Sequence, residues 1–204
     1  MRVMLLIASL LASTHAASAA DRTVENLAAA GRAVGYVRYF YPSDECQEAD
    51  WDAVTAMIVQ RTWDAPSPEA LADAIEKALA PIAPALQIWP TAGEHEEPPV
   101  ALEPEGRTPN GWIGWHHSGV RHANAQGQQS IYNSRRTRTR DAGGDGRIAK
   151  ASSVITNDLG GGVSCRMPIV LAYDDEGIMP AAEGDVAAAE PGDARSVRVA
   201  AVIT

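Results

Sequence analysis

The spacing of apolar residues changes near residue 90, and this change constrains the fold more than any other feature of the sequence. Three segments before it place apolar residues at helical intervals: 23–41, 50–64 and 68–80. Pro42 forbids continuation of the first segment, Pro68 suits the first turn of the third, and Pro81 stops that third segment. The sequence therefore predicts a small helical unit over residues 21–89.

After residue 90 the pattern becomes that of β-strands. A Pro/Glu-rich stretch, 90–111, has no periodicity and is expected to be a linker. Segments with strand character follow, separated by glycine-rich turns: "GWIGWHH", "QSIYNSRRTRTR", "RIAKASSVIT" and "GVSCRMPIVLAY". They predict a β-rich module over 112–180, either an antiparallel sheet or a sandwich-like arrangement. The remaining residues, 181–204, are interpreted as a linker and the truncated start of a further helix, so the expected fold class is α+β.

The first twenty residues predict a cleavable signal peptide. Arg2 precedes an apolar run, and Ala17-Ser18-Ala19 offers a cleavage site of the A-x-A kind. The apolar run is short for a bilayer span, although an uncleaved anchor is the alternative interpretation. We therefore expect a periplasmic or secreted protein with no stable membrane span after cleavage.

Charge is distributed unevenly along the chain. The formal net charge is -9, which argues against nucleic acid as a partner, yet residues 107–150 are basic. Within them, "SRRTRTR" should place Arg136, Arg138 and Arg140 on one face of a strand. The favoured interpretation is a solvated strand that resists edge pairing. The alternative is a face that binds anions or docks on an acidic neighbour, including the acidic helical unit of this chain.

Two other residue sets suggest binding or cross-linking. Trp112 and Trp115 could form a sugar-stacking surface, although aromatic residues on strands more often pack in a core or against a neighbouring strand. Cys46 and Cys165 could form a disulfide in an oxidising compartment, or could both be small buried residues.

The sequence predicts no catalytic, cofactor or metal site. "GVSCR" begins like a nucleophile elbow but lacks the final glycine, and Lys77 and Lys150 are the only lysines available to a Ser–Lys pair. His116 and His117 should point to opposite faces of a strand and so do not easily share one metal ion.

Several segments resemble one family of exported serine peptidases. "NLAAAGRAVGYVRYFYPSDECQEADWD" (26–52) resembles the opening of the C-terminal-processing, or tail-specific protease, family. Further segments are similar to that family in the same order: "PIAPALQI", "GWHHSGV", "IYNSRR" and "GGGVSCRMPIVLAYDDEGIMP". The chain departs from the family pattern at His116, where Gln is usual, and at Cys46, which replaces a small residue.

The resemblance implies a region that precedes the peptidase domain and supplies neither its serine nor its lysine. On this interpretation the chain as given hydrolyses nothing and needs no cofactor. It helps recruit a peptide or protein substrate, or packs against the downstream peptidase domain of the same polypeptide. Two alternatives remain: a stand-alone module that binds glycans or peptides, and an autonomous hydrolase.

Overall fold

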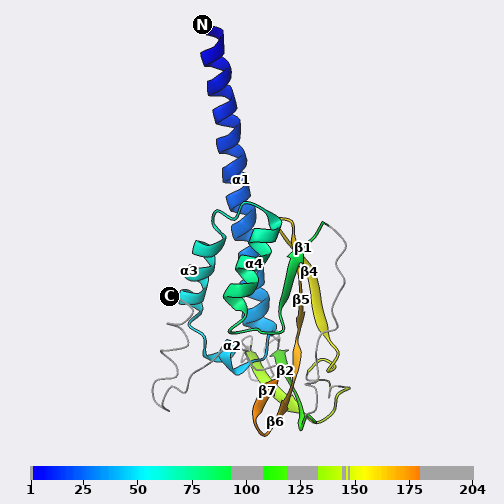
Figure 1. Cartoon of the computed structure of the whole chain (residues 1–204). Helices are drawn as coiled ribbons and strands as arrows, with labels where there is room; N and C mark the ends of the chain where they lie inside the picture. The colour runs from blue at the N-terminus through cyan, green and yellow to red at the C-terminus, as the bar shows by residue number, and fades with distance from the viewer. Residues whose placement is uncertain (1, 93–107, 119–132, 144–145, 147, 180–204) are drawn as a thin grey trace, which may run out of the picture.

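The protein has an α+β fold in which helices cover one sheet and stand on a second (Figure 1). The computed structural model describes residues 2–92, 108–118, 133–143, 146 and 148–179, and side chains from residue 21 to 178 within these ranges. Its helices are α1 (Arg2–Phe40), α2 (Asp44–Glu48), α3 (Trp51–Thr62) and α4 (Pro68–Leu79). Its strands are β1 (Gln87–Pro90), β2 (Gly111–Ser118), β3 (Asn133–Thr139), β4 (Val154–Gly160), β5 (Val163–Pro168), β6 (Val170–Asp174) and β7 (Gly177–Met179).

Local capping signals define the helices. The Asp50 side chain accepts hydrogen bonds from two backbone N–H groups at the start of α3, and the Ser67 hydroxyl accepts one at the start of α4, where Pro68 follows. These two helices lie where the sequence predicts them. The first helix ends at Phe40 before Pro42, as predicted, but begins at Arg2 rather than at residue 23.

The strands form two antiparallel sheets, with orders β1-β5-β4 and β3-β2-β6-β7. "GVSCRMPIVLAY", expected as one strand, is two: it leaves the first sheet at Pro168 and enters the second at Val170. Pro168 has no N–H to donate, which suits the end of a strand, and the N–H of Ile169 bonds instead to the carbonyl of Ser153. "RIAKASSVIT" was expected as a strand too, but regular pairing begins only at Val154.

The helices and the three-stranded sheet share one hydrophobic core. It contains, among others, Val37, Leu71 and Ile75 from helices and Leu159 and Met167 from strands. The expected helical unit over 21–89 is thus not separate from the strands. Its last residues form β1, which pairs with β5, and the expected linker over 90–111 overlaps β1 at one end and β2 at the other.

A glycine-rich turn of the three-stranded sheet packs closely against the helices. Gly160, at the end of β4, and Gly161 and Gly162, which connect it to β5, all have positive φ angles. A Cβ atom added to Gly161 would lie 2.9 Å from Cδ2 of Leu71 in α4. Arg32 of α1 donates a hydrogen bond to the carbonyl of the residue before the turn. The absence of side chains at the turn therefore allows helices and sheet to approach closely.

Two expectations concern regions outside this description. The further helix expected within 181–204 lies entirely outside the described residues, as does most of the expected linker. Within the part that the structure describes, no helix is both long and apolar enough to cross a membrane.

Candidate docking site

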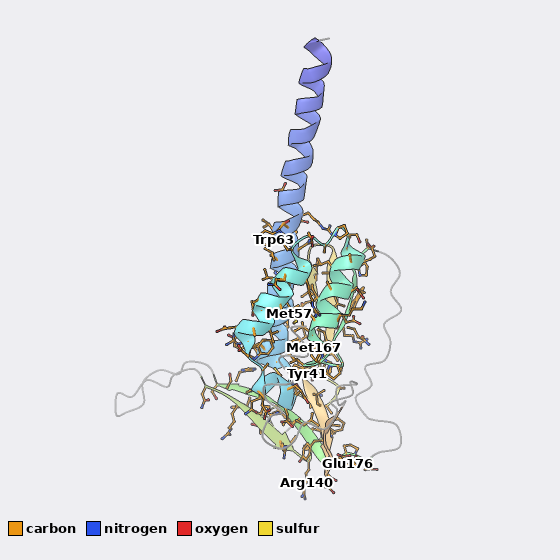
Figure 2. The ribbon with its side chains drawn as sticks, turned by 60° about the vertical axis from the view of Figure 1, so that its left-hand side comes forward. Tyr41, Met57, Trp63, Arg140, Met167 and Glu176 are labelled. Carbon is orange, nitrogen blue, oxygen red and sulfur yellow. The ribbon has the colours of Figure 1, made fainter. Side chains whose placement is uncertain are left out.

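The turn that follows α1 joins the helices to the four-stranded sheet. We call residues 40–44 the corner. Tyr41 is fully buried, and its hydroxyl accepts a hydrogen bond from the backbone N–H of Ala85 at 3.2 Å. Burial raises the pKa of this phenol well above its usual value. Figure 2 shows Tyr41 at the level where the helices meet the lower sheet. The corner is therefore a fixed part of the packing, not an exposed platform.

Backbone carbonyls of the corner accept hydrogen bonds from the sheet. The indole Nε1 of Trp115 in β2 donates to the carbonyl of Tyr41 at 3.1 Å. Nη1 of Arg136 in β3 donates to the carbonyl of Pro42 at 3.1 Å and lies 2.7 Å from Oδ1 of Asp44. A cation at this position also complements the negative end of the α1 dipole. Arg136 thus docks on the acidic helical part of the same chain. This is the contact that the alternative interpretation of the arginine face describes, docking on an acidic neighbour within the chain.

A pocket lies beside this contact. Its volume is about 430 Å³, and its walls come from α2, β2 and β3: Gln47, Ile113, Trp115, Ser134, Arg135, Arg136 and Arg138. The wall thus combines guanidinium groups with an aliphatic and an aromatic side chain. Such a lining suits an anionic group attached to an apolar stem. We call it the arginine pocket.

A serine and a histidine meet at the edge of this pocket. Nδ1 of His117 lies 2.7 Å from Oγ of Ser134, directly across the β2–β3 pair. The imidazole stacks on Trp115, with ring centroids 6.2 Å apart, and meets the ring of Phe40 edge-on at 5.2 Å. The pair has the side-chain types of a nucleophile and its base. Its packing between two aromatic rings equally fits a cross-strand contact that holds the corner in place.

The predicted binding residues separate into two groups. Trp115, Arg136 and Arg138 come together at the arginine pocket. Trp112 does not join them, because residues three apart on a strand point to opposite faces. It is buried, with 7% of its surface exposed, in a separate apolar cluster. The two tryptophans therefore do not form the possible sugar-stacking surface, and Trp112 instead packs in a core, as aromatic residues on strands more often do.

Arg140 also lies apart from the pocket. It follows the last residue of β3 and is exposed. Figure 2 shows it at the end of the lower sheet, far from Tyr41. The three arginines expected on one face therefore differ in their contacts. Arg136 contacts the corner, Arg138 lines the pocket wall, and Arg140 lies beyond both.

The two cysteines are buried free thiols, so the possible disulfide between them is not formed. Cys46 lies in α2, and its Sγ donates to the carbonyl of Val37 at 3.2 Å. Cys165 lies in the middle strand of the three-stranded sheet, between Ile88 and Asn157. Burial raises the pKa of the Cys46 thiol to about 12 and that of Cys165 to about 11. Both cysteines therefore fit the alternative interpretation, that they are small buried residues.

Metal binding finds no support in the described residues. They contain no group of three or more His, Cys, Asp or Glu side chains able to hold a metal ion together.

Sequence reasoning did not identify Gln47, Ile113, Ser134 and His117 as part of the site. Alternation could have found three of them, because Ser134 shares a face with Arg136 and Arg138, and Ile113 and His117 share one with Trp115. Gln47 gives no such signal, because its place depends on how α2 packs on the sheet.

Comparison of this chain with protein-family models, with curated proteins and with solved structures found no match.

Proposed function

We propose that this chain is the non-catalytic N-terminal region of an exported serine peptidase of the C-terminal-processing family. Its role is to dock a peptide or protein substrate, or to pack against the peptidase domain that follows in the same polypeptide. The family assignment rests on the ordered segments "GYVRYFYPSDE", "GWHHSGV", "IYNSRR" and "GGGVSCRMPIVLAY". Export rests on the signal-peptide pattern of the first twenty residues.

The arginine pocket is the observation that carries the docking role. Arg136 is mostly buried, with 18% of its side chain exposed, and already has Asp44 and the Pro42 carbonyl as partners. Arg135 and Arg138 are exposed at the same wall. A site that holds one arginine rigidly and presents two others to solvent is suited to a partner that carries carboxylates.

The same geometry weakens the glycan alternative. That interpretation depended on two tryptophans forming one surface, and Trp112 lies on the opposite face of β2, inside an apolar cluster. Trp115 alone remains at the pocket, and its indole N–H is already bonded to the corner.

A direct test of the proposed assignment is the DNA that follows the codon for Thr204. We expect an open reading frame that continues into a peptidase domain with its own serine and lysine. A stop codon at that point in the natural gene would overturn the proposal that this is part of a longer peptidase. Export is tested separately by N-terminal sequencing of the protein from the periplasm or medium, where we expect a chain that begins at Asp21.

Hydrolysis by this chain itself is the second candidate, and the Ser134–His117 contact is the observation that favours it. Against it, Ser134 lies within a strand whose pairing with β2 is regular from Trp112 to Ser118, without the sharp turn that exposes a nucleophile in an elbow. We expect no labelling of the chain by a fluorophosphonate probe. Labelling that is lost in Ser134→Ala would instead establish an autonomous hydrolase.

A further inference from the structure

The strand that carries the arginines is the edge of its sheet. In the described part of the chain, the order is β3-β2-β6-β7, and β3 has β2 as its one strand neighbour. Along such an edge, alternate residues direct their N–H and C=O groups away from the sheet. Asn133, Arg135 and Arg138 along this strand are exposed. The edge therefore combines main-chain pairing capacity with accessible positive charge.

Arg138 is held in a defined position at this edge. Its guanidinium carbon lies 4.8 Å from the centroid of the Tyr173 ring in β6, and its side chain lines the arginine pocket. Stacking on an aromatic face orders a guanidinium while its N–H groups stay able to bind a carboxylate in two places. Arg136, two residues earlier, is on the same face but is engaged by the corner. The binding cation at this face is therefore Arg138.

Charge also determines which strands can pair here. Antiparallel pairing of two copies of β3 would bring arginine side chains close to one another, and like charges opposite each other on a sheet are destabilising. A strand whose side chains alternate between acidic and neutral would instead place its carboxylates on the arginine face, because that face is occupied by every second residue. The edge thus disfavours self-association and suits an extended acidic segment of another protein.

We propose that β3 binds an extended acidic peptide segment of a partner protein, which adds to its open edge as a further strand. Carboxylates at every second position of the segment meet Arg138 and the arginine pocket, which Trp115 also lines. This inference rests on the proposed docking role and specifies its partner and binding mode.

The test is a titration of the chain with a fluorescein-labelled peptide of alternating Glu and Thr, blocked at both ends, followed by fluorescence anisotropy. We expect saturable binding. Arg138→Gln should weaken it about fivefold or more, because a charge-assisted hydrogen bond is lost. The matched control, Arg140→Gln, removes the same charge just beyond β3 and should weaken binding less than about twofold, because only screened long-range attraction changes. Urea unfolding of each variant establishes that the fold is retained.

Two further peptides separate strand addition from attraction between opposite charges. A peptide with Lys in place of Glu should not bind the natural chain. A Glu–Thr peptide with N-methyl groups on alternate amides keeps its charge but cannot form the strand ladder, and it should lose binding. Equal weakening by Arg138→Gln and Arg140→Gln, or unchanged binding of the N-methylated peptide, would overturn the inference. If the peptides fail while a peptidase domain is found downstream, the inference is wrong and the proposed function stands.

Discussion

Arg136→Met tests whether the corner is held chiefly by the contact between a guanidinium and a backbone carbonyl. The substitution keeps an apolar stem of similar length but removes every donor. The Pro42 carbonyl then loses the charged donor that lies 3.1 Å away, and Asp44 loses its ion-pair partner. A hydrogen bond to a charged group contributes about 1.5–3 kcal/mol. The pair with Asp44, whose side chain is 50% exposed, contributes about 0.5–1 kcal/mol because water screens it.

Together these contributions predict that Arg136→Met lowers the free energy of unfolding by about 2–4 kcal/mol. Asp44→Asn should lower it by only about 0.5–1 kcal/mol, because the carbonyl contact survives. Arg138→Met is the matched control on the same face. Its guanidinium is exposed over the ring of Tyr173, so we expect a loss below about 1 kcal/mol.

Urea unfolding followed by circular dichroism measures all three variants, with the midpoint and the slope fitted separately. A loss for Asp44→Asn as large as that for Arg136→Met would show that the ion pair, not the carbonyl contact, holds the corner. Equal losses for Arg136→Met and Arg138→Met would show that the corner contact has no special weight. Either result would refute the reasoning.

Three further predictions concern packing and the cysteines. Gly161→Ala should destabilise the protein by about 2–4 kcal/mol, because a positive φ angle is combined with a Cβ placed 2.9 Å from Leu71. The control is Gly146→Ala, where φ is also positive but no atom lies within 4 Å of the added Cβ. It should lower the free energy of unfolding by about 1 kcal/mol in the same urea assay. Gly35→Ala lies inside α1 with nothing within 4 Å and should raise stability by about 0.5–1 kcal/mol; any loss would mean that α1 packs differently. Because burial raises the pKa of the Cys46 thiol to about 12, the unfolded chain releases this proton first once the pH rises above about 8.5. Stability should therefore fall as the pH rises from there toward 12, less steeply in Cys46→Ala, and iodoacetamide at pH 8 should modify Cys46 only in urea.

The sequence predicts the helices well because their signals are local. Asp50, Ser67 and Pro68 act within one turn of the helix that each begins, so no knowledge of the rest of the fold is needed. The short helix α2 was missed because its five residues, Asp44–Glu48, are too few for a periodic pattern. Ser43 nevertheless caps it, accepting a hydrogen bond from the N–H of Cys46.

The arrangement of the strands depends on contacts that a periodic pattern does not record. β1 has only four residues, and Glu76 of α4 accepts a hydrogen bond from the N–H of Ile88 within it. Its membership of a sheet follows from pairing with β5, far away in the chain. The chain changes sheets at Pro168, and this change has a local cause. The residues on both sides of it are apolar, however, so the sequence pattern indicates one strand where the structure has two.

Part of the site could have been predicted and part could not. Strict alternation along β2 already separates Trp112 from Trp115, so their register alone argues against a shared sugar-stacking surface and leaves packing in a core or against a neighbouring strand. The partner of Arg136 could not be derived in the same way. It is a carbonyl, that of Pro42, and every residue has one, so only the three-dimensional path of the chain selects it.

The same distinction explains the aromatic segment "GYVRYFYPSDE" at the end of α1. Its aromatic residues are spread over more than one face of the helix, which favours packing over a binding surface. The buried ring of Tyr41 and the edge-on contact of Phe40 with His117 place two of the rings in the packing. This segment contacts the sheet through its backbone, because the carbonyls of Tyr41 and Pro42 accept hydrogen bonds from the side chains of Trp115 and Arg136. Those two donors line the arginine pocket as well. A substitution that moves the corner should therefore alter the pocket too, so the stability of the corner and any docking at β3 are coupled through shared residues.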